Sequence, residues 1–101
     1  MEKAIEYLNE NFTFEISREG LAALLDINPD NLGRIFKKYT GKKLSDYINE
    51  LRIKDAALKL TNTDDNIVNI AFSVGFESLS TFNRVFLKIM KITPTGYRNS
   101  F

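Results

Sequence analysis

The sequence contains no cysteine and no histidine. These two absences exclude disulfide bonds, thiolate and imidazole ligands for zinc, cysteine nucleophiles and every catalytic triad that depends on histidine. The paired acids Asp64 and Asp65 fall in a polar connection that suits helix capping, and neither a GxSxG motif nor a phosphate-binding glycine pattern occurs. The sequence therefore predicts a protein that is not an enzyme and that holds neither a metal nor a cofactor.

Long apolar segments are also missing. No run of about 18 apolar residues occurs, and residues 1–12 are acidic and amphipathic, whereas a secretion leader is basic and then apolar. The chain has 101 residues, of which 44% are hydrophobic and 27% are charged, and this is the size and balance of one globular domain. We expect a cytoplasmic protein with no membrane segment.

Charge is distributed unevenly along the chain, although the net charge is only +1. Residues 1–33 hold two basic side chains, Lys3 and Arg18, against seven acidic ones: Glu2, Glu6, Glu10, Glu15, Glu19, Asp26 and Asp30. Two runs without acids follow, made of Arg34, Lys37, Lys38, Lys42 and Lys43, and of Arg84, Lys88, Lys91 and Arg98. One such run is typical of a solvated helix face, but two at matching places favour a surface that binds nucleic acid.

Apolar residues recur at helical spacing nearly everywhere, which predicts an all-α domain of seven helices. The expected helix starts are Ser17, Asn28 before Pro29, Asp65 or Asn66, and Thr93 before Pro94. The third helix is expected to end at Gly41 and to turn four side chains inward: Leu32, Ile35, Phe36 and Tyr39. The fourth helix, at about residues 44–60, is the longest, and its apolar stripe changes face midway.

An internal repeat relates the two halves of the chain. A shift of 50 residues aligns LGRIFKKYTGKKLSDY with FNRVFLKIMKITPTGY, and it pairs Arg34/Arg84, Phe36/Phe86, Lys38/Lys88 and Tyr47/Tyr97. A shift of 49 aligns LAALLDI with IAFSVGF, and it pairs Ala22/Ala71 and Ile27/Phe76. Packing repeats apolar positions, but it does not require basic residues at equivalent solvent-facing positions. The repeat therefore predicts two helix-turn-helix units.

The residues at each turn suit such a unit, which needs a small residue where its helices cross, a tight turn and an apolar plug. Ala22 and Ala71 are the small residues, and Ile27 and Phe76 are the plugs. Gly75 can adopt the positive φ of the second turn. The polar residues that follow then form the outer face of a recognition helix. A plain helical bundle, in which those residues only cap and pack, is the alternative.

The second half also resembles a known family. NIVNIAFSVGFESLSTFNRVFLKIMKITPTGYR is similar to the signature I-x-x-I-A-x-x-x-G-F, F-x-R-x-F and P-x-x-Y-R of the arabinose-operon regulator family (AraC/XylS), and the resemblance runs nearly end to end. The matching residues are Ile67, Ile70, Ala71, Gly75, Phe76, Phe82, Arg84, Phe86, Pro94, Tyr97 and Arg98. The resemblance implies a homeodomain-like tandem: helix-turn-helix subdomains at residues 1–42 and 62–101, joined by a linker helix at 43–61, with recognition helices entering successive major grooves.

By the same resemblance, DNA contacts fall on Asp30, Asn31, Gly33, Arg34, Lys37 and Lys38 in the first unit and on Ser78, Leu79, Ser80, Asn83, Arg84 and Lys88 in the second. Asp30 disfavours phosphate, so it either reads a cytosine amino group or stabilises the helix N-terminus. Gly33 offers a base no donor, and Leu79 suits a thymine methyl group. Direct readout in the first unit then rests mostly on Arg34 and Asn31.

The resemblance further implies a bacterial, nucleoid-associated regulator of transcription, usually an activator that touches RNA polymerase beside a promoter. Relatives commonly carry an upstream ligand-sensing, dimerising or phospho-receiver domain, although freestanding members of this size exist. We expect this chain to be a monomer that binds double-stranded DNA. The alternative from another class is a helical protein-interaction module whose basic faces meet acidic partners.

Overall fold

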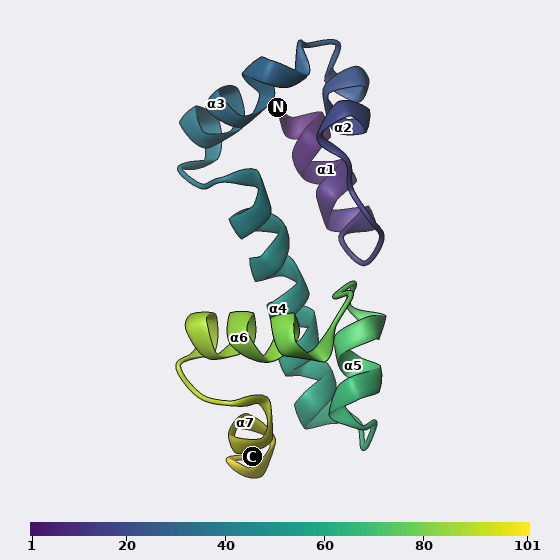
Figure 1. Ribbon diagram of the computed structural model, residues 1–101, viewed down its shortest axis with the longest axis vertical. Coiled ribbons are helices and arrows are strands. Elements are labelled where there is room, and N and C mark those ends of the chain that lie inside the picture. The colour runs from purple at the N-terminus through teal and green to yellow at the C-terminus, as the bar shows by residue number, and fades with distance from the viewer. The chain divides into compact units, whose positions relative to one another are not determined.

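The computed structural model describes residues 1–101 and consists of seven α-helices without any strand, which confirms the all-α prediction. Two compact units divide the chain within its longest helix, the first covering Met1–Ile48 and the second Asn49–Phe101 (Figure 1). None of the seven helices combines the length and the apolar character that crossing a bilayer requires. The division into two subdomains and a linker at residues 43–61 stays a prediction.

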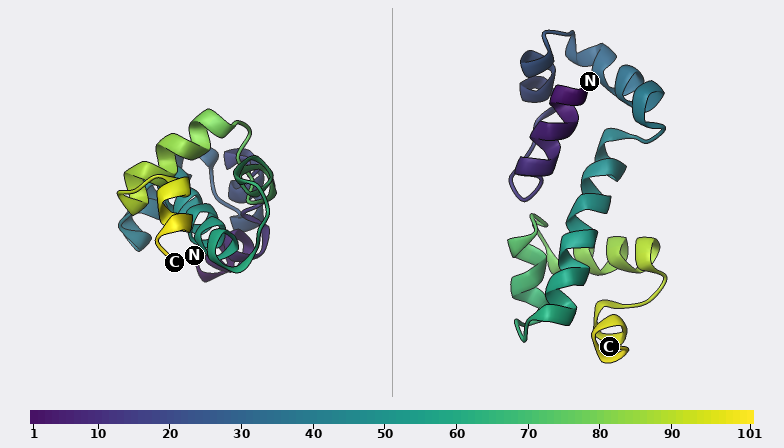
Figure 2. Two further views of the ribbon diagram at one scale, coloured as in Figure 1. Left: turned by 90° about the horizontal axis from the view of Figure 1, so that it is seen from below. Right: turned by 180° about the vertical axis from the view of Figure 1, so that it is seen from behind.

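The first unit contains α1 (Glu2–Asn11), α2 (Arg18–Leu25), α3 (Pro29–Thr40) and the start of α4 (Leu44–Asn62). Two of the predicted caps start helices here: the Ser17 hydroxyl accepts a hydrogen bond from the Gly20 amide at 2.9 Å, and the Asn28 side chain accepts one from Asp30 at 2.8 Å. Figure 2 shows α1 and α2 side by side. The buried residues of this unit are all apolar: Ala4, Leu8, Leu21, Ala22, Leu32, Phe36 and Ile48.

Tyr39 departs from the expectation that it faces inward. It lies in the last turn of α3 and is 59% exposed, whereas Leu32 and Phe36 are fully buried and Ile35 is half-buried. The ring that covers Phe36 is instead Tyr47, at the start of α4, with ring centroids 5.4 Å apart in an edge-on arrangement. The prediction for Tyr39 was therefore wrong: its ring stays exposed, and the ring that packs on Phe36 comes from the next helix.

The second unit contains the rest of α4 together with α5 (Ile67–Ser73), α6 (Leu79–Met90) and α7 (Pro94–Asn99). Asn66, and not Asp65, caps α5, since its side chain accepts a hydrogen bond from the Asn69 amide at 2.8 Å. The Thr93 hydroxyl caps α7 by accepting from the Gly96 amide at 3.0 Å. Helix α6 crosses α4 (Figure 1), and the second half of α4 contributes the buried residues Ile53, Ala56, Ala57 and Leu60 to the core.

Aromatic rings connect the elements of the second unit. Phe82 lies 5.4 Å from Phe76 and 5.6 Å from Phe86, measured between ring centroids, and Phe86 lies 5.7 Å from Tyr97. Edge-on and tilted pairs of this kind stabilise a core by about 0.5–1.5 kcal/mol beyond the apolar area that they bury. The rings therefore hold the plug at the turn, the inner face of α6 and the final helix α7 in one packed layer.

Candidate nucleic-acid interface

The turns between α2 and α3 and between α5 and α6 have the same backbone hydrogen bonds. The Ile27 amide donates to the Ala22 carbonyl at 3.0 Å, and the Phe76 amide donates to the Ala71 carbonyl at 3.1 Å. Both alanines are fully buried, and Phe76 is buried while Ile27 is half-buried. This bond runs from the amide of the sixth residue to the carbonyl of the first, as in a Schellman motif, which ends a helix and lets the chain turn sharply. The two predicted helix-turn-helix units therefore share the same turn structure.

The Schellman motif requires a left-handed residue just before each plug. Asp26 fills this position with φ of 56° in the first unit, and Gly75 fills it with φ of 112° in the second, as predicted for the glycine. The ends of α3 and α6 match in the same way: the Gly41 amide donates to the Lys37 carbonyl at 2.7 Å, and the Lys91 amide donates to the Leu87 carbonyl at 2.9 Å. The second helix of each helix-turn-helix, α3 or α6, thus ends with the same type of cap.

Helix α3 presents all six predicted contact residues of the first unit to solvent: Asp30, Asn31, Gly33, Arg34, Lys37 and Lys38. Asp30, Gly33, Arg34 and Lys37 have the i, i+3, i+4, i+7 spacing that aligns side chains along one helix face. Arg34 and the two lysines form no ion pair. Asp30 stands in the first turn, where a negative charge stabilises the helix dipole.

Helix α6 presents four of the six predicted residues of the second unit to solvent: Ser80, Asn83, Arg84 and Lys88. Ser78 and Leu79 are half-buried. The Ser78 hydroxyl accepts from the Thr81 amide at 3.2 Å and lies 3.0 Å from the Thr81 hydroxyl, so it serves as the cap of α6. Leu79 packs against the core cluster. Roles for these two residues in contacting DNA stay predictions.

Two residues lie where sequence reasoning did not place them. Leu87 is 48% exposed on α6, and its position seven residues after Ser80 was the signal that it shares that face. Arg98 belongs to the second basic run, which favoured a surface that binds nucleic acid. It donates from Nε to the Leu60 carbonyl at 3.1 Å and from Nη2 to the Thr63 carbonyl at 3.2 Å. It therefore satisfies carbonyls near the C-terminal end of α4.

Comparison with known proteins also finds helix-turn-helix domains. A helix-turn-helix domain model matches residues 21–100. The activator RhaR of Mannheimia succiniciproducens is 31% identical over 101 residues, which are the whole of this chain and 37% of RhaR. An AraC-type DNA-binding regulator from Chromobacterium violaceum has a TM-score of 0.88 at 29% identity, covering 98% of this chain and 88% of that one.

The chain belongs to the AraC-type helix-turn-helix family. The C-terminal domain of the response regulator yesN from Fusobacterium nucleatum is also similar, with a TM-score of 0.89 and 33% identity over 96% of this chain and 95% of that one. The fold is shared with the DNA-binding domain of AdpA, solved with a target DNA, at a TM-score of 0.91 and 21% identity, covering 98% of this chain and 89% of AdpA's. This AraC-type chain spans about a third of the length of its first curated relatives.

A partly buried cation supports the second turn of this AraC-type domain. The Arg52 guanidinium on α4 lies 5.7 Å from the centre of the Phe76 ring, within the range of a cation–π interaction. Burial lowers the pKa of Arg52 from its ordinary value, and the charge of Glu77 opposes that shift. Arg52 thus interacts with the ring of the plug and with the charge of Glu77, the residue that follows the plug.

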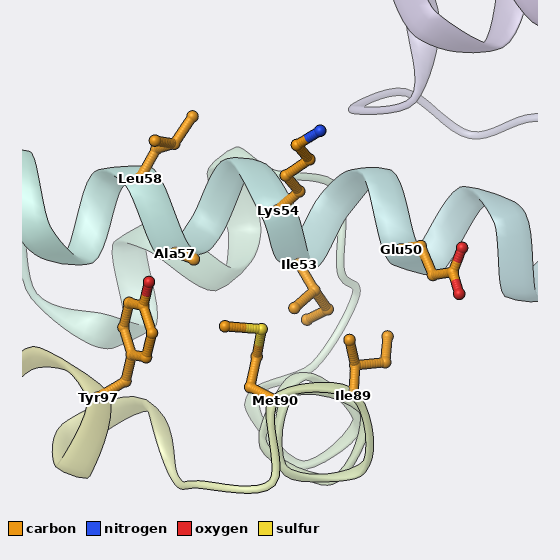
Figure 3. Close-up of a pocket in the computed structure, with 8 residues that line it drawn as sticks. All are labelled: Glu50, Ile53, Lys54, Ala57, Leu58, Ile89, Met90 and Tyr97. Atoms are coloured by element: carbon orange, nitrogen blue, oxygen red, sulfur yellow. The ribbon is translucent and has the colours of Figure 1, made fainter.

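A groove of about 270 Å³ lies between α4, α6 and α7 of the second unit (Figure 3). Figure 3 shows Ile53, Met90, Ile89 and Tyr97 facing one another across it, and Glu50, Lys54, Ala57 and Leu58 complete its lining. None of these residues is among the predicted DNA contacts. Every buried residue of the chain is apolar, and no three acidic, histidine or cysteine side chains gather into a metal-binding group.

Proposed function

We propose that this AraC-type domain binds double-stranded DNA sequence-specifically, with α3 and α6 entering successive major grooves, and regulates transcription. The observation that carries the proposal is the pair Arg34 and Arg84, exposed at equivalent positions on two helices that follow the same turn. An exposed arginine on a recognition helix is the side chain that most often reads guanine, through two hydrogen bonds to O6 and N7. A duplicated arginine therefore fits a two-part DNA site.

The neighbouring side chains divide between bases and phosphates. Asn83 has the amide that pairs with adenine in the major groove, and Ser80 can donate to or accept from several bases. Lys37, Lys38 and Lys88 are exposed and suit phosphate oxygens, which position the protein without carrying sequence information. The exposed face thus combines sequence readout with electrostatic attachment.

A selection from random duplex DNA tests this proposal. The purified domain is incubated with the library at about 0.1 M salt, and bound DNA is sequenced after several rounds. We expect an asymmetric motif in two parts whose centres lie about 10 bp apart, because successive major grooves on one face repeat with that period. A motif with only one part would contradict insertion of both helices.

The competing function is a protein-interaction module whose basic faces bind acidic partners. Its discriminating property is the salt dependence of duplex binding, since phosphate contacts release counterions and the logarithm of affinity falls linearly with the logarithm of salt concentration. We expect a slope of that kind for any duplex, with tighter binding to the selected motif. Salt-insensitive or absent duplex binding would favour the protein-interaction module.

We further propose that the domain activates transcription and that it does so by contacting RNA polymerase. Activation is suggested by the similar RhaR, which is named a transcriptional activator. Transcription in vitro from a promoter beside the selected motif should rise when the domain is added, and a fall would indicate a repressor. Light scattering should give a monomer.

The domain itself is proposed to catalyse no reaction, although the similar AdaA of Bacillus subtilis is named as both an activator and a DNA repair enzyme. An upstream sensor or receiver domain and a nucleoid-associated location stay predictions.

A further inference from the structure

Leu87 is an exposed apolar side chain on an otherwise polar face of α6. The inner face of this helix buries Phe82, Val85 and Phe86, so the core is complete without Leu87, which remains 48% exposed. The equivalent residue of the first unit is Lys37, which is also exposed. Packing therefore gives no reason for a leucine at this position, and solvent exposure alone disfavours one.

The position of Leu87 on the helix gives a reason. Ser80, Asn83, Arg84 and Leu87 are spaced i, i+3, i+4 and i+7, which is the spacing of the base-reading positions on a homeodomain recognition helix in the major groove. Leu87 lies seven residues beyond Ser80, or roughly 10 Å along the helix axis at 1.5 Å per residue. That distance corresponds to about three base pairs at 3.4 Å each.

Only one chemical group in the major groove suits a leucine. Guanine, cytosine and adenine present hydrogen-bond donors or acceptors there, whereas thymine adds a 5-methyl group. A leucine side chain can neither donate nor accept a hydrogen bond, and it gains nothing from a phosphate. Burying one methyl-sized group stabilises a complex by a factor of about four in affinity.

We propose that Leu87 contacts a thymine methyl group and gives the second half of the DNA site a preference for thymine, about three base pairs from the base that faces Ser80. This inference rests on the proposed function, because it needs α6 in a major groove. It differs from the thymine contact predicted for Leu79, since Leu79 packs against the core at the start of α6 while Leu87 is free on the outer face.

Removal of single methyl groups from the DNA tests the contact directly. In the duplex obtained by selection, each thymine is replaced in turn by deoxyuridine, and the affinity of the unmodified domain is measured for each duplex. The same series is then measured with Leu87→Ala and with Leu79→Ala. We expect one replacement to weaken binding of the unmodified domain about fourfold and to leave Leu87→Ala unaffected, while Leu79→Ala keeps the fourfold loss.

A matched control uses Leu58→Ala, since Leu58 is 57% exposed on α4 and is not among the candidate contacts. It should reproduce the unmodified series. The inference is overturned if every replacement gives the same ratio in Leu87→Ala as in the unmodified domain, or if the loss disappears in Leu79→Ala instead. An unmodified domain that selects no duplex would overturn the proposed function, and the Leu87 contact with it, so the two failures are distinguishable.

Discussion

The two helix-turn-helix units share one backbone framework but carry different outer faces. The turn hydrogen bonds and the caps of the second helices recur at equivalent positions. On the exposed faces only the basic residues Arg34/Arg84 and Lys38/Lys88 are repeated, while Asp30, Gly33 and Lys37 are replaced by Ser80, Asn83 and Leu87. The first unit therefore presents mainly charge, and the second presents the hydrogen-bonding and apolar groups that distinguish bases. The two units thus share a backbone framework, while their exposed faces differ.

The left-handed positions illustrate that separation. Each unit has one left-handed position just before the apolar plug and one at the end of α3 or α6. In each unit, one of the two positions is a glycine and the other is not. The first unit has Asp26 and Gly41, whereas the second has Gly75 and Lys91. The duplicated feature is thus the backbone conformation. A residue other than glycine holds it at a cost of about 1–2 kcal/mol, somewhat less for aspartate.

The largest expected effect concerns the rings at the centre of each unit. Phe36→Ala and Phe86→Ala should each destabilise their own unit by about 3–5 kcal/mol, because each removes a fully buried ring. Phe86→Ala should cost roughly 0.5–1.5 kcal/mol more, since Phe86 contacts the rings of both Phe82 and Tyr97, whereas Phe36 contacts only Tyr47. Hydrogen exchange of the amides in each unit measures the two losses separately.

Equal losses from the two phenylalanine variants would contradict the difference in ring packing. If alanine unfolds a unit outright, Phe36→Leu and Phe86→Leu give the same comparison at a smaller cost. The order of the two effects, rather than their size, then decides the outcome.

The next effect separates the two DNA-facing surfaces. Arg34→Ala and Arg84→Ala should each weaken binding to the selected duplex by about 1–3 kcal/mol and relax base preference in different halves of the motif. Lys38→Ala and Lys88→Ala are the matched controls. They should weaken binding to all duplexes alike and reduce the salt slope by about 1. Arginine variants that bind like the unmodified domain would show that α3 and α6 are not the recognition helices.

Arg98 has no basic counterpart in the first unit, where Ile48 occupies the equivalent position. Arg98→Ala should destabilise the second unit by about 1–2 kcal/mol, because the carbonyls of Leu60 and Thr63 lose a charged donor. Denaturant unfolding measures this loss, and Arg98→Lys should recover little of it because lysine lacks the planar donor geometry. A salt slope of DNA binding lowered as in Lys88→Ala would instead place Arg98 on phosphate.

The sequence was sufficient to predict the features that depend on local chemistry. Ser17, Asn28 and Thr93 cap helices as their residue types predict, and the repeat located both turns. Three-dimensional packing decided the rest. Periodicity could not show that Tyr47 covers Phe36 or that the guanidinium of Arg98 reaches carbonyls more than 30 residues earlier. Charge counting treated all basic residues alike, whereas long-range hydrogen bonds separate structural cations from those available to DNA.

The smallest expected effect tests why the first unit keeps a glycine on its DNA-facing surface. An alanine Cβ at Gly33 would meet no atom within 4 Å, and the same holds for Gly41, but only Gly41 has a positive φ, of 79°. Gly33→Ala should therefore stabilise the domain by about 1 kcal/mol through helix propensity. Gly41→Ala should destabilise it by about 1–2 kcal/mol through backbone strain.

Thermal unfolding and DNA affinity of the Gly33 and Gly41 variants then answer separate questions. If Gly33→Ala stabilises the fold and binds the selected duplex unchanged, this position of α3 makes no close approach to the bases. A stabilised variant that binds more weakly would instead mean that the missing Cβ leaves room for DNA. The first unit would then recognise DNA by a close approach of its backbone as well as by charge. At the equivalent position on α6, by contrast, the Asn83 side chain would contact the bases directly.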